Sequence, residues 1–128
     1  MSYYFNTTLD MGFDEAVEAV TAALAAKGFG IMTTIDVKAA MKKKLGADMP
    51  SYTILGSCNP QYAHKALQAE NKIGTMLPCN VVVQQLEDGR IEVSAVDPAA
   101  SMQAIDNPQL ASIAGDVRTM LQEIIAGL

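Results

Sequence analysis

The residues best suited to chemistry in this chain are its two cysteines, Cys58 and Cys79, and its single histidine, His64. Each cysteine stands at an end of a predicted strand, and Cys58 directly precedes Asn59-Pro60, a pair typical of a helix start. Because the positive end of a helix favours a thiolate, Cys58 is the better candidate for a reactive or ligating sulfur. Unpaired cysteines also fill space in cores, so simple packing remains an alternative.

Cys58, Cys79, His64 and Met102 together form a set of soft donors that would suit Cu(I), zinc or haem iron. The spacing gives this metal site little support, because the chain contains no CxxC, HxxxH or CxxCH motif. A lone histidine such as His64 is more often a partly exposed surface or dimer-contact residue than a metal ligand. A disulfide between the cysteines is disfavoured in a reducing cytoplasm.

Other chemistries fit the sequence less well. Gly28-Phe29-Gly30 follows a predicted helix rather than a strand, which is the wrong order for a nucleotide-binding loop. The chain has a net charge of -5, and its one basic cluster, Lys38 with residues 42–44, is explained by a helix end. We therefore expect no nucleic-acid partner.

The composition indicates an ordered domain. Half of the residues are hydrophobic and 18% are charged, a balance that excludes intrinsic disorder. No apolar run is long enough to cross a bilayer, and the first residues lack the pattern of a secretory signal. We expect a cytoplasmic protein without a membrane partner, folded as one domain over residues 1–128.

Hydrophobic periodicity, together with the capping, glycine and proline residues that start and end helices, predicts the elements that position these side chains. Strands are expected at 3–8, 29–35, 52–58, 79–86 and 90–96, and helices at 13–24, 37–45, 60–69, after Asp97-Pro98 and from Asn107-Pro108 to the end of the chain.

Two turns have specific chemistry. Gly28 stands where a left-handed residue ends the first helix, with Phe29 packing back onto Leu24 in a Schellman-type stop. Asp88-Gly89 predicts a two-residue type I′ hairpin that pairs Glu87 with Arg90. That register places Cys79 opposite Pro98, with Met102 one turn further along the next helix.

Polar residues interrupt the strands, which favours an α+β fold of two layers over a doubly wound sheet. We expect about five mainly antiparallel strands with helices packed mostly on one face. A flavodoxin-like α/β fold is the alternative, because strands and helices alternate over residues 1–79. Cys58 and Cys79 meet only if their strands are antiparallel neighbours; parallel strands would leave the cysteines a strand length apart.

Two stretches resemble the signatures of a family known as domain of unknown function 302. They are ILGSCNPQYAHKAL at 54–67 and GTMLPCNVVV at 74–83, followed by Val96-Asp97-Pro98 and Met102; Ser57 departs mildly from the pattern. The resemblance covers nearly the whole chain. It implies a small two-layer α/β dimer, arranged like the TATA-binding-protein fold, and it implies no reaction.

Three functional hypotheses remain open. The leading one is an uncharacterised, non-catalytic homodimeric binding module, whose pocket is formed by Cys58, Asn59 and Cys79, with His64 and Met102 as further metal ligands. Its ligand would be a soft metal ion or a small sulfur-containing molecule. The second is a redox enzyme with Cys58 as activated thiolate and Cys79 as resolving partner. The third is a structural or partner-binding protein with packed cysteines.

Overall fold

The structure is a computed structural model that describes residues 2–128. Five strands form one sheet in the order β1-β5-β4-β3-β2, and every neighbouring pair is antiparallel. The strands are β1 (Tyr4–Leu9), β2 (Gly30–Asp36), β3 (Tyr52–Cys58), β4 (Cys79–Gln85) and β5 (Ile91–Val96).

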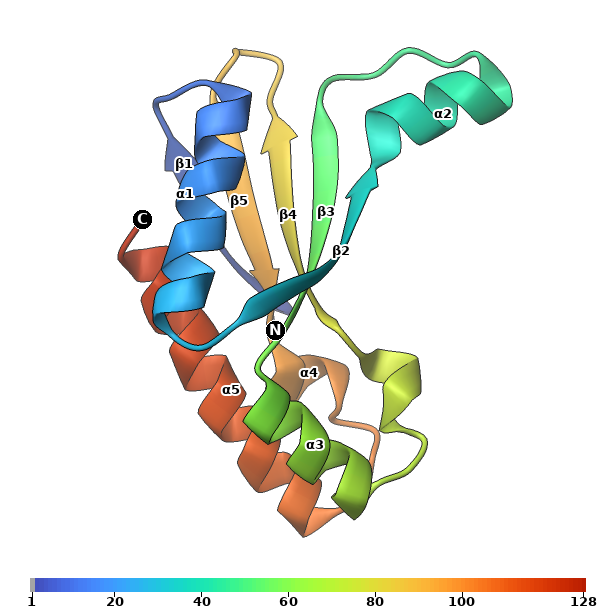
Figure 1. The fold of residues 1–128 in the computed structure, drawn as a ribbon, viewed down its shortest axis with the longest axis vertical. Coiled ribbons are helices and arrows are strands. Elements are labelled where there is room, and N and C mark those ends of the chain that lie inside the picture. Colours follow the sequence, from blue (N-terminus) through green and yellow to red (C-terminus); the bar gives the residue numbers. More distant parts are fainter. Residues whose placement is uncertain (1) are drawn as a thin grey trace.

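The two longest helices, α1 (Phe13–Ala26) and α5 (Pro108–Ala126), cover one face of the sheet (Figure 1). Below the sheet in this view lie the helices α3 (Pro60–Ala69) and α4 (Pro98–Ser101) and the 3-10 turn η1 (Ile73–Met76). Helix α2 (Val37–Leu45) projects from the β2 edge at the opposite end. Among the described residues, no helix is both long enough and apolar enough to cross a membrane.

The predicted α+β architecture is confirmed, and each predicted boundary that can be compared lies within two residues of the observed one. The flavodoxin-like alternative is wrong, because that fold needs parallel neighbours. In β4 and β5, buried side chains that face the helices alternate with more exposed side chains on the other face.

The buried apolar residues form two clusters. The main cluster joins the sheet to α1 and α5, through residues such as Val20, Val83 and Leu121. A smaller cluster joins α3, η1, α4 and the start of α5, and it includes Ala66, Met102 and Leu110. Helix α5 contributes to both clusters and so connects the two parts of the fold.

The Schellman-type end of α1 is confirmed. Gly28 has φ +85°, and the N–H of Phe29 donates to the carbonyl of Leu24 at 2.9 Å.

The helix-start pairs also lie at the predicted positions. Asp97 and Asn107 accept hydrogen bonds from backbone N–H groups in the first turns of α4 and α5, whereas Asn59 holds the N-cap position of α3 without a side-chain capping bond.

The predicted two-residue hairpin is wrong. The N–H of Leu86 donates to the carbonyl of Arg90 at 2.8 Å, so the loop has three residues, Glu87 to Gly89. Only Gly89, at φ +87°, has a positive φ, whereas a type I′ turn would also need one at Asp88. The added loop residue shifts the register to Val81↔Ala95, one position from the pairing that placed Cys79 opposite Pro98.

Candidate functional site

The two cysteines lie side by side where β3 ends and β4 begins. The antiparallel register pairs Ser57 with Cys79, so Cys58 is the next residue along β3. The Ser57 hydroxyl donates to the carbonyl oxygen of Cys79 at 3.0 Å, and both residues are buried. The sequence predicted that Cys58 and Cys79 meet only if their strands are antiparallel neighbours, and β3 and β4 are such a pair. Both cysteines are free thiols.

A cavity of about 30 Å³ opens beside this strand junction. It lies between the two apolar clusters, because Phe29, Cys79 and Val117 belong to the main cluster and Met102 and Leu110 to the smaller one. The full lining is Phe29, Ser57, Cys58, Asn59, Tyr62, Ala63, Ala66, Leu77, Cys79, Pro98, Met102, Leu110, Ile113, Ala114 and Val117. The half-buried members of this set are Cys58, Asn59, Tyr62, Ala63, Leu77 and Ile113.

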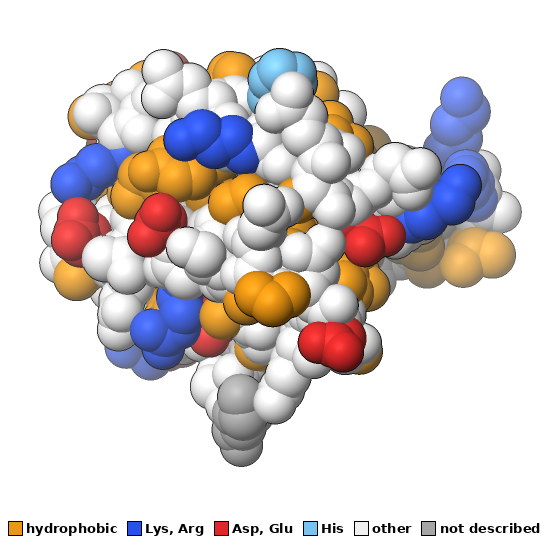
Figure 2. Space-filling view, turned by 90° about the horizontal axis from the view of Figure 1, so that it is seen from below, with side chains coloured by type: hydrophobic (Ala, Val, Ile, Leu, Met, Phe, Trp, Pro, Cys, Tyr) orange, Lys and Arg blue, Asp and Glu red, His pale blue; other side chains and the backbone are white. Residues whose placement is uncertain are grey.

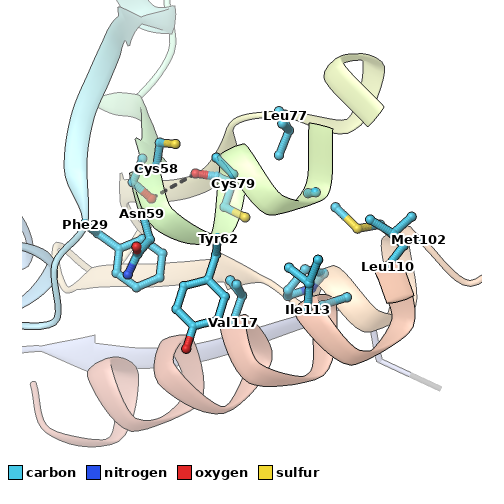
Figure 3. Close-up of a pocket in the computed structure, with 15 residues that line it drawn as sticks. Phe29, Cys58, Asn59, Tyr62, Leu77, Cys79, Met102, Leu110, Ile113 and Val117 are labelled. Atoms are coloured by element: carbon cyan, nitrogen blue, oxygen red, sulfur yellow. Dashed lines mark hydrogen bonds between the residues drawn. The ribbon is translucent and has the colours of Figure 1, made fainter. Parts of the chain in front are cut away.

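The sulfurs of the lining residues point in different directions (Figure 3). The Cys79 and Met102 sulfurs project into the cavity from β4 and from the end of α4. Successive strand residues face opposite sides of a sheet, so Cys58 faces the side opposite to Ser57 and Cys79. Cys58 thus borders the cavity, but its sulfur does not point into it.

Asn59 links two elements at the rim of the cavity. Its Nδ2 donates to the carbonyl oxygen of Lys27 at 3.4 Å, at the end of α1. The Asn59 side chain makes no capping hydrogen bond to α3. A glycine suits position 28, because its φ of +85° is strained for other residues and a Cβ there would lie only 3.3 Å from Asn59 Nδ2. Asn59 therefore positions the start of α3 against the end of α1.

His64 lies elsewhere. It is exposed on α3 and does not line the cavity, and Figure 2, which views this end of the molecule from below, shows it at the surface. The structure thus brings Cys58, Asn59, Cys79 and Met102 to one cavity and leaves His64 outside. Within residues 2–128, no three His, Cys, Asp or Glu side chains are grouped to hold a metal ion.

Both thiols are shifted toward the neutral form. Burial, together with a smaller effect of negative charge on the neighbouring Cys58, raises the pKa of the Cys79 thiol to about 11. Burial also raises the pKa of Cys58. The helix N-terminus therefore does not produce the lowered pKa that the sequence suggested for Cys58, because loss of solvation is the larger effect.

Sequence reasoning misses most of the cavity wall. Tyr62, Leu77, Ile113 and Val117 line the cavity, yet their sequence signal is only that of an apolar helix face or strand flank. Val117 and Ile113 belong to the apolar stripe of the last helix, which predicts core packing and carries no sign of a cavity. For Tyr62, the sequence offers only the Asn59-Pro60 pair, which places this residue in the first turn of a helix.

The comparisons with known proteins agree with this architecture. The family model described as "Domain of unknown function DUF302" matches residues 5–128. The crystal structure of an uncharacterized conserved DUF302 protein from Bacillus stearothermophilus is similar at 27% sequence identity and a TM-score of 0.91, covering 98% of each chain. No curated protein matches the chain. The chain therefore belongs to the family described as domain of unknown function DUF302.

Proposed function

We propose that this domain is a non-catalytic binding module that holds a small uncharged ligand, apolar or sulfur-containing, in the cavity beside Cys79. The observation that carries the proposal is the apolar cavity into which a neutral thiol and the Met102 thioether project. Such a wall offers dispersion contacts and soft sulfur contacts but few strong hydrogen bonds.

The chemistry of the wall favours an uncharged ligand over a metal ion. To bind at Cys79, a soft metal would have to displace the proton of a thiol whose pKa is raised to about 11, and this cost weakens metal binding at neutral pH. The Cys58 sulfur and His64 do not face the cavity, so the four-donor set from the sequence is not assembled. An ion would also lose its hydration in an apolar space.

The redox hypothesis receives no support from the thiols. An attacking cysteine needs a pKa near or below the ambient pH, whereas burial raises the pKa values of both Cys58 and Cys79. A cytoplasmic location is part of this proposal, because a reducing compartment suits a cavity whose ligand contacts the free thiol of Cys79.

The size of the cavity limits the ligand. A volume of about 30 Å³ accommodates a group of about two or three heavy atoms, compared with about 300 Å³ or more for a drug-sized pocket. The ligand is therefore a very small molecule, or the small apolar end of a longer one that extends out of the cavity.

Chemical unfolding in the presence of a panel of probes tests this function. The probes are dimethyl sulfide as an uncharged thioether, and Cu(I) and Zn²⁺ as metals. A ligand that binds only the folded state at ten times its dissociation constant raises the free energy of unfolding by about 1.4 kcal/mol. We expect this increase with dimethyl sulfide and not with either metal.

Two leucine variants of α5 provide the matched comparison. Ala114→Leu adds bulk at the buried cavity wall, whereas Ala111→Leu adds the same atoms at an exposed position one turn earlier. Stabilisation by dimethyl sulfide should disappear in the first variant and persist in the second. Stabilisation by Cu(I) alone, or an equal effect of dimethyl sulfide in both variants, would exclude the proposed ligand class.

A further inference from the structure

Strand β1 is an open edge of the sheet. Within residues 2–128 it pairs with β5 on one side and with no strand on the other. Proteins protect such edges with charged side chains, prolines or bulges, because an open edge can pair with another chain. The opposite edge, β2, has a register shift between Ile31 and Thr33. β1 pairs regularly with β5 and its sequence, YFNTTL, contains no charged residue and no proline, so it has none of these protections.

The register shows which backbone groups of β1 face outward. The N–H of Asp97 donates to the carbonyl of Tyr3 at 2.8 Å, so Tyr3 and every second residue after it bond to β5. The N–H and C=O groups of Tyr4, Asn6 and Thr8 therefore point away from the sheet. Those of Tyr4 bond to the hydroxyl of the serine two residues before it, whereas those of Asn6 and Thr8 have no partner among the described residues.

Helix α5 forms a wall along this edge. Arg118, Gln122 and Ile125 recur at spacings of four and three residues, so they share one face of the helix. Two hollows lie between this face and β1, and Phe5 borders both. The first hollow includes Arg118, and the second includes Gln122, Ile125 and Thr7. In Figure 1 the C-terminal end of α5 lies on the β1 side of the sheet. We call the space between β1 and α5 the edge groove.

Arg118 provides an oriented cation at one end of the edge groove. Its Nε donates to Oδ2 of Asp97 at 3.1 Å, and its guanidinium carbon lies 5.2 Å from the centre of the Phe5 ring. Asp97 is only 7% exposed, and its other oxygen accepts from the N–H groups of Ala99 and Ala100. An arginine has five N–H donors, so the two terminal nitrogens of Arg118 remain for a second acceptor. Their geometry fits a carboxylate in a bidentate pair.

We propose that the edge groove binds the C-terminal segment of another protein as an added antiparallel strand, with its terminal carboxylate on Arg118. Arg118 lies beside Phe5 and the groove continues along Thr7, so a segment that ends at Arg118 runs antiparallel to β1. Its backbone pairs with the outward groups of Asn6 and Thr8, and every second side chain faces α5.

The charges along the edge groove define the partner further. Arg118 and Asp97 are the charged residues among those that line the two hollows, and Asp97 is already bonded to Arg118. The second hollow is lined by uncharged side chains, including Ile125 and Ala126. The bound segment therefore needs one negative charge, at its end, and uncharged β-forming residues before it.

Two tetrapeptide probes test the carboxylate contact by NMR titration. Acetyl-Thr-Val-Thr-Val ends either in a carboxylate or in a carboxamide, and its valines face α5 when the last residue lies opposite Phe5. We expect the carboxylate probe to bind about tenfold or more tightly than the carboxamide probe. In Arg118→Gln this ratio should fall to about one. Arg90→Gln, which changes the exposed arginine that precedes β5, should leave the ratio unchanged.

The strand pairing is tested by changing the probe, so the fold of the protein stays intact. N-methylation of the third probe residue removes the N–H that faces Asn6, whereas N-methylation of the second removes one that points away from β1. The first change should weaken binding about tenfold or more, and the second by less than about threefold. The backbone amide signals of Asn6 and Thr8 should shift with the carboxylate probe, and those of β2 should not.

Several results would overturn the proposal. One is the absence of binding of either probe at millimolar concentration, and another is equal binding of the carboxylate and carboxamide probes by the wild type. A preference for the carboxylate that Arg118→Gln leaves intact would also contradict it. So would shifts of the Asn6 and Thr8 signals on dilution without peptide, because these would show that β1 pairs with a second copy of the chain.

Discussion

At the residue scale, the central feature is a thiol that burial keeps neutral. Cys79 is 9% exposed, its carbonyl accepts from Ser57, and its sulfur faces apolar side chains. The same burial that makes Cys79 a poor nucleophile makes it a compatible wall for an uncharged ligand. Residue type alone could not distinguish these roles, because a reactive and a packed cysteine have the same letter in the sequence.

The raised pKa of Cys79 predicts how stability changes with pH. A thiol with a pKa of 9.0 when unfolded and about 11 when folded retains its proton longer in the folded state. Its contribution is therefore complete below pH 9 and is lost as the pH rises toward 11. The full shift corresponds to at most about 3 kcal/mol.

Urea unfolding of the wild type and of Cys79→Val at pH 8 and pH 11 measures this contribution. The free energy of unfolding should fall more in the wild type, because lysine and tyrosine titration affects both proteins alike. Equal losses in the two proteins would show that Cys79 has no raised pKa.

At the element scale, the end of α1 and the start of α3 position the rim of the cavity together. Gly28 adopts the left-handed conformation at the end of α1, and Asn59 donates to the carbonyl of Lys27 beside it. Because the Asn59 side chain donates to the carbonyl of Lys27, it makes no capping hydrogen bond to α3, although Asn59 holds the N-cap position of that helix. The two elements are adjacent in space although thirty-two residues separate Lys27 from Asn59.

Gly28→Ala tests this junction against Gly30→Ala. Alanine at φ +85° is strained, and its Cβ would also lie 3.3 Å from Asn59 Nδ2, so the free energy of unfolding should fall by about 1–2 kcal/mol. A Cβ at Gly30 meets nothing within 4 Å, so that variant should change stability by less than about 0.5 kcal/mol. Urea denaturation giving equal losses for both variants would contradict the account.

The elements themselves are largely predictable from the sequence, because their signals are local. Apolar periodicity and the three Asx-Pro pairs locate the helices, and Gly28 marks the end of α1. The β4–β5 loop is not predicted correctly, because Asp88-Gly89 suits both a two-residue turn and a three-residue loop with a bulge. The direction of the Cys58 sulfur depends on strand register, and the position of His64 depends on how α3 packs, which local signals do not determine.

At the scale of the whole molecule, the cavity exists because two apolar clusters meet without filling the space between them. The sheet with α1 and α5 forms one cluster, and α3, η1, α4 and the start of α5 form the other. Cys79 and Met102 approach the cavity from opposite clusters. A ligand there would contact both clusters and stabilise their arrangement, as expected of a binding module.

The most direct measurement is an NMR titration of methyl-labelled methionine with dimethyl sulfide. The Met102 methyl signal, assigned with Met102→Leu, should shift with saturation in the wild type and remain fixed in Ala114→Leu. The methyl signal of Met32, which is 66% exposed and does not line the cavity, should not move in either protein. An unchanged Met102 signal, or equal shifts at Met102 and Met32, would contradict a cavity that binds small uncharged ligands.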